Sequence, residues 1–165
     1  MTETEPGEPT VHRYEATVRW HGTTGVGYAG YSRDHEGWAE PAQPRLSLSG
    51  DVAFGGSAER LDPEQLVVLA AASCQLLSFL AVAARARIDV VAYQDDAVGD
   101  MPERGSKSTS IETIGLRPRI EVRGDASVER VRRLVELAHQ ECYVANSLHT
   151  TITVEPTITF VRDGE

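Results

Sequence analysis

The chain has 165 residues, and its 25 acidic side chains outnumber its 16 basic ones, which gives a formal net charge of −9. This length predicts one domain with a substantial core, and an acidic chain without a basic cluster is unsuited to binding nucleic acid. Two cysteines are too few for a disulfide framework, and the acidic start MTETEPGEPT does not resemble a signal peptide. We therefore expect a disordered tail over residues 1–10, a single domain over residues 11–165, and a cytoplasmic location where thiols are often catalytic.

Three strands are expected before the first helix. The stretch YEATVRW, residues 14–20, alternates apolar and other side chains as a half-buried strand does. The glycine-rich residues 22–30 predict a hairpin or bulged turn, because no helix pattern follows that would complete a phosphate-binding loop. Residues 27–36 are the expected return strand, residues 44–50 a short third strand, and residues 51–60 a loop.

A long apolar helix is expected from Asp62 to about Arg87. Asp62 suits the N-cap position, and Pro63 suits the first position of a helix. Residues 66–84 carry no charge and are long enough to span a membrane, but several of them are polar and both flanks resemble soluble sheet. We interpret the segment as the central helix of a globular core and expect no membrane association.

The second half of the chain predicts strands over residues 89–101, 109–124 and 150–160, with a turn at residues 102–110. A second helix starts near Asp125 or Ser127, and its apolar spacing places Cys142 on the inward face if the helix reaches that residue. In the strand at 109–124 one face is apolar, formed by Ile114, Leu116, Ile120 and Val122. The predicted order is β-β-β-α-β-β-α-β, which indicates an α+β fold.

Cys74 and Cys142 are the candidate reactive residues. Either could be a small apolar core residue, but both occupy inward positions on helices, and packed helices could bring the sulfurs within disulfide range. A thiol that reduces peroxide must be ionised, and a second thiol should trap the sulfenic acid that it forms. It also needs a fixed cation, because burial alone raises a thiol pKa. Candidate cations in the N-terminal strands are Arg33, Arg45 and Arg19.

Glu64 could hold such an arginine through a bidentate ion pair. A glutamate in the first turn also stabilises any helix through the helix dipole, so this role has a structural alternative. Ten residues separate Glu64 from Cys74, or about 15 Å along one helix. If both serve one site, two copies of the helix must cross around a two-fold axis, which predicts a homodimer with sites at its interface.

Two segments resemble motifs of the OsmC/Ohr family (osmotically inducible protein C and organic hydroperoxide resistance protein). LDPEQLVVLAAASC, residues 61–74, is similar to that family's Pro-Glu motif with its Ala-rich stretch and cysteine, and CYVANS, residues 142–147, to its second-cysteine motif. The resemblance implies an OsmC-like fold, an intertwined α+β homodimer and thiol-dependent reduction of organic and other hydroperoxides. We expect no cofactor, and no metal because the sequence has no CxxC or HxxxH spacing. It implies that Cys74 is the peroxidatic cysteine, Cys142 the resolving cysteine and Glu64 the carboxylate that positions an arginine.

The sequence departs from the family pattern at three places. The glycine-rich segment after the first strand holds no arginine, so Arg33 is the expected substitute. Asp62 and Tyr143 stand where Asn and Pro are common in the family. The predicted function is a thiol-dependent peroxidase in the oxidative stress response, with an organic hydroperoxide as substrate and a dithiol or lipoyl-type compound as reductant. The alternatives are a non-enzymatic binding module or a structural dimer with inert cysteines.

Overall fold

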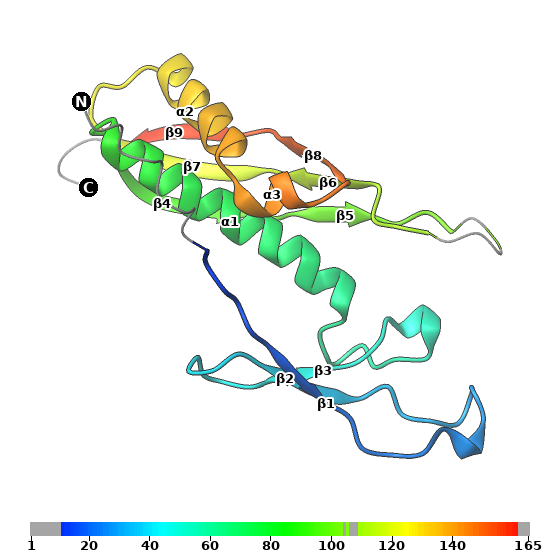
Figure 1. Ribbon diagram of the computed structural model, residues 1–165. Helices are drawn as coiled ribbons and strands as arrows, with labels where there is room; N and C mark the ends of the chain where they lie inside the picture. Colours follow the sequence, from blue (N-terminus) through cyan, green and yellow to red (C-terminus); the bar gives the residue numbers. More distant parts are fainter. Residues whose placement is uncertain (1–10, 104, 106–108, 162–165) are drawn as a thin grey trace, which may run out of the picture. The chain divides into compact units, whose positions relative to one another are not determined.

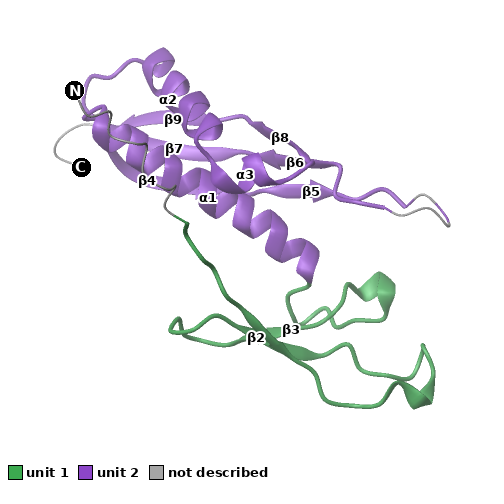
Figure 2. Ribbon diagram, in the orientation of Figure 1, with its two compact units in different colours: residues 1–62 green, residues 63–165 purple. Residues whose placement is uncertain are grey.

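The computed structural model describes residues 11–103, 105 and 109–161 (Figure 1). The chain divides into two compact units, residues 1–62 and residues 63–165 (Figure 2). The tail predicted at residues 1–10 lies outside the described residues, as does part of the turn predicted at 102–110. That residues 11–165 form a single domain stays a prediction.

The first unit is built on a three-stranded antiparallel sheet of order β1-β2-β3. Its strands are β1 (Thr17–Arg19), β2 (His35–Trp38) and β3 (Leu46–Leu48). All three expected strands are present, but the return strand predicted from residue 27 begins only at His35. The intervening segment contains a 3-10 turn, η1 (Thr24–Val26), and Gly27 follows with a φ of 81°, which removes it from strand geometry. A second 3-10 turn, η2 (Val52–Phe54), lies in the predicted loop.

The second unit begins with α1 (Pro63–Arg85), a helix of 23 residues. This confirms the long predicted helix, with Pro63 at the first position, where its missing N–H costs no hydrogen bond. The helix stops where Arg87 adopts a φ of 57°, a left-handed conformation that reverses the chain into the next strand. By length and composition α1 could span a membrane, a property shared by core helices of soluble proteins.

Each of the three long strands predicted in the second unit is divided into two. The first becomes β4 (Asp89–Asp95) and β5 (Val98–Asp100), and the second becomes β6 (Thr113–Leu116) and β7 (Pro118–Arg123). The third becomes β8 (Thr151–Val154) and β9 (Thr157–Val161). The pieces pair in two sheets of the same pattern, β4-β7-β9 and β5-β6-β8, each with one antiparallel and one parallel pair.

The interruptions coincide on neighbouring strands. At the break between β6 and β7 the Arg117 N–H donates to the Asp95 carboxylate at 2.7 Å, so a side chain replaces a ladder partner. Pro118 follows and Pro156 interrupts the third strand, and neither residue has an N–H to donate. With each divided strand counted once, the predicted order and the α+β class are confirmed.

The second predicted helix is α2 (Val128–Gln140), capped by the Ser127 hydroxyl, which accepts from the Arg130 N–H at 3.2 Å. The helix does not reach Cys142, because it ends at Gln140. Cys142 has an extended backbone and precedes a short separate helix, α3 (Tyr143–Ser147). Its side chain is nonetheless buried, with 1% exposed.

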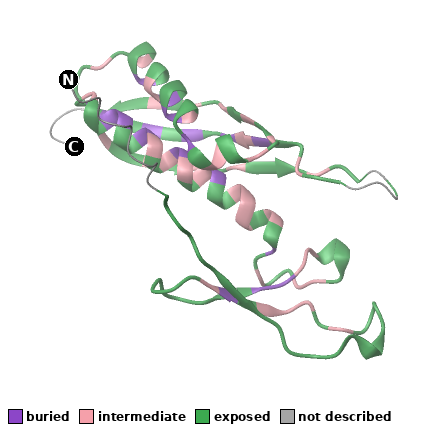
Figure 3. Cartoon of the chain, viewed as in Figure 1, coloured by how far each residue is buried: buried purple, intermediate pink, exposed green. Residues whose placement is uncertain are grey.

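The helices of the second unit cover one face of its sheets (Figures 1 and 3). In β7 buried residues alternate with exposed ones, and the four predicted inward residues of the strand pair, Ile114, Leu116, Ile120 and Val122, are all buried. Phe79 from α1 and Val135 from α2 pack in one cluster with Ile120 and Val122, while Ala71 from α1 packs with Ile114 and Leu116 in another. The opposite side of α1 leaves large apolar side chains exposed, with Leu69 at 56% and Leu77 at 63%. This helix therefore contributes to the core and also presents an apolar outer face.

Candidate active site

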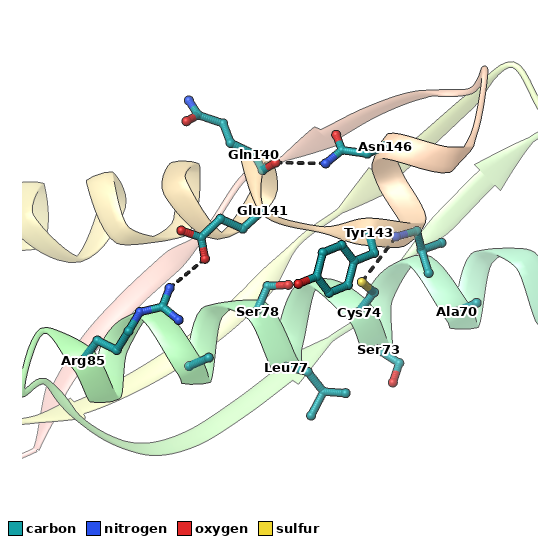
Figure 4. Close-up of a pocket in the computed structure, with 12 residues that line it drawn as sticks. Ala70, Ser73, Cys74, Leu77, Ser78, Arg85, Gln140, Glu141, Tyr143 and Asn146 are labelled. Atoms are coloured by element: carbon teal, nitrogen blue, oxygen red, sulfur yellow. Dashed lines mark hydrogen bonds and ion pairs between the residues drawn. The ribbon is translucent and has the colours of Figure 1, made fainter. Parts of the chain in front are cut away.

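Cys74 and Cys142 lie together although 67 residues separate them in the chain. Cys74 is in the middle of α1, and Cys142 stands just before α3, which packs beside α1. The Val144 N–H donates to the Cys74 sulfur at 3.5 Å (Figure 4), and the two cysteine side chains are hydrogen-bonded to each other. Both cysteines are free thiols. The fold thus pairs the two predicted thiols, as the sequence led us to expect.

The surroundings of Cys74 favour its ionised form. Burial alone raises its pKa, but four hydrogen-bond donors outweigh burial, and the pKa is lowered from the ordinary value. In order of importance these donors are the Cys142 thiol, the Val144 N–H, the Ser78 hydroxyl and the Tyr143 N–H. A negative sulfur at this position is therefore stabilised by neutral donors.

Cys142 is perturbed in the opposite direction. Burial raises its pKa, and the hydrogen bond that it gives to Cys74 raises it further, to about 11. The two thiols therefore differ in acidity, and Cys74 is the first of the pair to lose its proton. Cys74 is the sulfur that ionises, while Cys142 keeps its proton and donates it toward Cys74.

The sequence reasoning missed two kinds of donor to Cys74. Ser78 is four residues after Cys74, so both side chains lie on the same face of α1, and this spacing was readable from the sequence. The N–H groups of Tyr143 and Val144 carried no such signal. They reach the sulfur only because α2 ends before Cys142 and a new helix begins there.

A groove runs along α1 beside Cys74 (Figure 4). Its volume is about 760 Å³. Leu77 and Ala81 supply apolar wall, and at the far end Arg85 pairs with Glu141, with Nη2 and Oε2 2.6 Å apart. The complete lining is Ala70, Ser73, Cys74, Leu77, Ser78, Ala81, Arg85, Gln140, Glu141, Tyr143, Val144 and Asn146. The groove can hold an elongated, mostly apolar molecule with one end at the sulfur.

Glu64 does not line this groove. It is half-buried in the first turn of α1, about 15 Å along the helix from Cys74. Within one chain it is therefore too distant to share a ligand with Cys74. Its role as the carboxylate that positions an arginine stays a prediction.

The candidate arginines belong to the first unit. The Arg33 guanidinium donates to the backbone oxygens of Tyr31 and Tyr28 at 2.5 and 2.6 Å, and it stacks 3.9 Å from the centre of the Tyr31 ring. These contacts fix the guanidinium plane. Arg45 and Arg19 both stack on the Trp38 ring, at 4.2 and 5.1 Å. Which of the three serves Cys74 stays a prediction.

Comparisons with known proteins agree with this architecture. The family described as OsmC-like protein matches residues 56–157, more than half of the chain. The chain therefore belongs to the OsmC-like family, which confirms the resemblance noted in the sequence. No match was found among curated protein sequences.

Solved structures with the same fold include an OsmC-like protein of unknown function from Vibrio cholerae. It is 28% identical with a TM-score of 0.78, over 89% of this chain and 100% of that one. An organic hydroperoxide resistance protein from Elizabethkingia anophelis is 19% identical with a TM-score of 0.67, over 92% and 99% of the two chains. An organic hydroperoxide resistance protein OsmC from Legionella pneumophila is 18% identical with a TM-score of 0.61, over 88% and 97%. These likenesses confirm the OsmC-like fold.

Proposed function

We propose that this protein is a thiol-dependent peroxidase that reduces organic hydroperoxides through Cys74 and Cys142. The observation that carries the proposal is the pairing of one thiol of lowered pKa with a second, protonated thiol beside a largely apolar groove. The Elizabethkingia and Legionella proteins, which share the fold, are named organic hydroperoxide resistance proteins. The family relationship therefore supports the same substrate class.

The first step follows from the ionisation of Cys74. Its thiolate attacks the distal oxygen of the hydroperoxide, the O–O bond breaks, and the alcohol leaves after taking up a proton. Cys74 is then a sulfenic acid, two electrons more oxidised than the thiol. The Ser78 hydroxyl and the N–H groups of Tyr143 and Val144 hold the sulfur in place until it reacts.

The second step uses the proton that Cys142 retains. The Cys142 sulfur attacks the Cys74 sulfur, and its proton leaves with the displaced hydroxide as water, so a disulfide remains. An external dithiol or lipoyl-type reductant then reopens the disulfide by exchange and supplies two electrons. Because Cys142 is 1% exposed, it is sheltered from reagents that have not first reached Cys74.

We further propose that the protein works as a homodimer, in which Glu64 and Arg33 complete the site. The exposed apolar face of α1 around Leu69, which lies outside the groove lining, is the surface that a second copy would cover. Arg33 would supply the cation and Glu64 would orient it through a bidentate pair. Sedimentation of the wild type and Leu69→Glu tests this arrangement: a wild-type monomer at micromolar concentration contradicts it, and a weakened dimer in the variant supports it.

The activity is tested by treating reduced protein with one equivalent of an alkyl hydroperoxide and measuring its mass and residual peroxide. We expect loss of two hydrogens, a Cys74–Cys142 peptide, and consumption of the peroxide. Cys142→Ser should stop at a sulfenic acid on Cys74, and Cys74→Ser should not react. Two free thiols beside unconsumed peroxide in the wild type would reject the reaction.

The alternative of a binding protein with inert cysteines predicts an ordinary or raised pKa at Cys74. The donors around Cys74 favour the opposite, so the peroxidase is preferred. Alkylation of Cys74 as a function of pH decides between the two: a midpoint at or above the ordinary value of a cysteine supports the inert alternative.

A further inference from the structure

One end of the groove is the reactive sulfur, and the other is an ion pair that the reaction does not use. Cys74, Leu77, Ala81 and Arg85 lie at helical spacing on one face of α1, so the groove follows the helix. The backbone positions of Cys74 and Arg85 are about 16 Å apart along the axis. An elongated molecule with its reacting end at the sulfur would therefore extend toward Arg85.

Arg85 has hydrogen-bonding capacity to spare. Within the described part of the chain its guanidinium donates to the Glu141 carboxylate alone, through Nη2. A guanidinium has five N–H donors and can hold a carboxylate in a bidentate manner. The pair is half-exposed, with 61% of the Arg85 side chain and 46% of the Glu141 side chain accessible, and exposed pairs of this kind are weak. An incoming anion can share the guanidinium or displace Glu141.

We propose that Arg85 is a specificity-determining residue that binds an anionic group at the far end of an unbranched hydroperoxide substrate. This inference rests on the proposed function, since it requires the reacting end to lie at Cys74. The substrate class is an amphipathic hydroperoxide: a peroxide at one position, an apolar chain along Leu77 and Ala81, and a carboxylate at the end. Glu141 competes with that carboxylate and thereby sets how strongly it is bound.

The experiment uses thiol-reactive probes, so that it does not depend on turnover. The probes are two maleimides on the same linear alkyl chain, one ending in a carboxylate and the other in its methyl ester. The rate of Cys74 modification is measured by mass spectrometry for the wild type, Arg85→Gln, Arg85→Lys and Glu141→Gln. Arg87→Gln is the matched control, because it removes the same charge two residues away and outside the groove lining.

We expect the wild type to prefer the carboxylate probe about three- to fivefold. Arg85→Gln should abolish the preference, Arg85→Lys should retain part of it, and Glu141→Gln should increase it. The ester probe should react equally with all of these proteins. The decisive result is that Arg85→Gln lowers the preference for the carboxylate probe while Glu141→Gln raises it. If the ion pair were purely structural, its loss would change this preference in the same direction in both variants.

Two results would overturn the proposal. If Arg85→Gln keeps the preference for the carboxylate, or if Arg87→Gln loses it equally, the anion is not bound by Arg85. A wild type that modifies Cys74 readily but does not distinguish the two probes removes this inference and leaves the peroxidase intact. A Cys74 that reacts with neither the probes nor peroxide removes the proposed function as well.

Discussion

Replacing Ser78 by Ala should make Cys74 a weaker acid. The Ser78 hydroxyl is one of the donors that lower the pKa of Cys74 against the effect of burial. A hydrogen bond to a charged group contributes about 1.5–3 kcal/mol, and we take about 1–1.5 kcal/mol because Cys74 is only partly buried. Since about 1.4 kcal/mol corresponds to one pH unit, the thiolate–thiol equilibrium should shift roughly five- to tenfold toward the thiol.

The assay is the second-order rate of alkylation of Cys74 by iodoacetamide as a function of pH. The midpoint should move upward in Ser78→Ala, and at pH values well below the midpoint the rate should fall by nearly the same factor. Ser73→Ala is the matched control, because Ser73 lines the same groove on α1 but is not among the donors to Cys74. An unchanged midpoint in Ser78→Ala, or an equal change in Ser73→Ala, would refute the assignment of the hydroxyl to the thiolate.

Two further predictions concern stability. Gly99→Ala should destabilise the fold by about 1–3 kcal/mol, because the added Cβ would lie 2.5 Å from a methyl carbon of Val68. Gly115→Ala on the next strand is the control, because its Cβ would meet only ordinary contacts at 3.9 Å or more. Chemical denaturation of both variants measures the difference in their free energies of unfolding. Asp95→Asn should raise the melting temperature at neutral pH but not near pH 3. Burial raises the pKa of Asp95 above 3.8, so the protonated carboxyl stabilises the fold below that pH, and this stabilisation is lost as the carboxyl ionises at higher pH. An equal rise in melting temperature at both pH values would contradict this reasoning.

The alternation of apolar residues correctly predicted the inward face of residues 109–124 and the order of the strands, but the apolar side chains of the half-buried strand predicted at residues 14–20 are exposed, with Tyr14 at 89% and Val18 at 73%. The apolar alternation continues across the break between β6 and β7. A single residue, Arg117, separates the two strands, so the two-residue period stays in phase from Leu116 to Pro118. The break itself depends on the Asp95 carboxylate, which accepts from the Arg117 N–H across the sheet. A partner 22 positions away carries no local signal, so the interruption could not be predicted.

The candidate site was predictable to a different degree. Helical spacing predicted that both thiols face inward. Cys142 is buried, but not on a helix: it lies in the connection between α2 and α3. The expectation that a fixed cation must lower the pKa of Cys74 overlooked the neutral donors, of which only Ser78 had a readable spacing. Backbone N–H groups are present at every residue, and only the folded chain shows which of them point at a sulfur.

The paired thiols should lose their protons in two well-separated steps. The first step, mainly at Cys74, should lie below the ordinary value of 9.0, and the second, at Cys142, at about 11. Ultraviolet absorbance of the thiolate measures both. In Cys74→Ser the step at Cys142 should move down, because the hydrogen bond to a thiolate is gone, but should stay above 9.0, because burial is the larger cause.

The same shift fixes how stability depends on pH. Since the pKa of Cys142 is higher in the folded protein than the 9.0 of an ordinary cysteine, the folded state binds the extra proton between pH 9.0 and about 11. The stabilisation is fully present below that window and is lost as the pH rises through it. The reduced wild type should therefore lose more stability across this range than Cys142→Ala. Equal losses, or a single step near 9.0 for both thiols, would mean that Cys142 does not hold its proton against Cys74, and the proposed proton donor of the second reaction step would have to be another group.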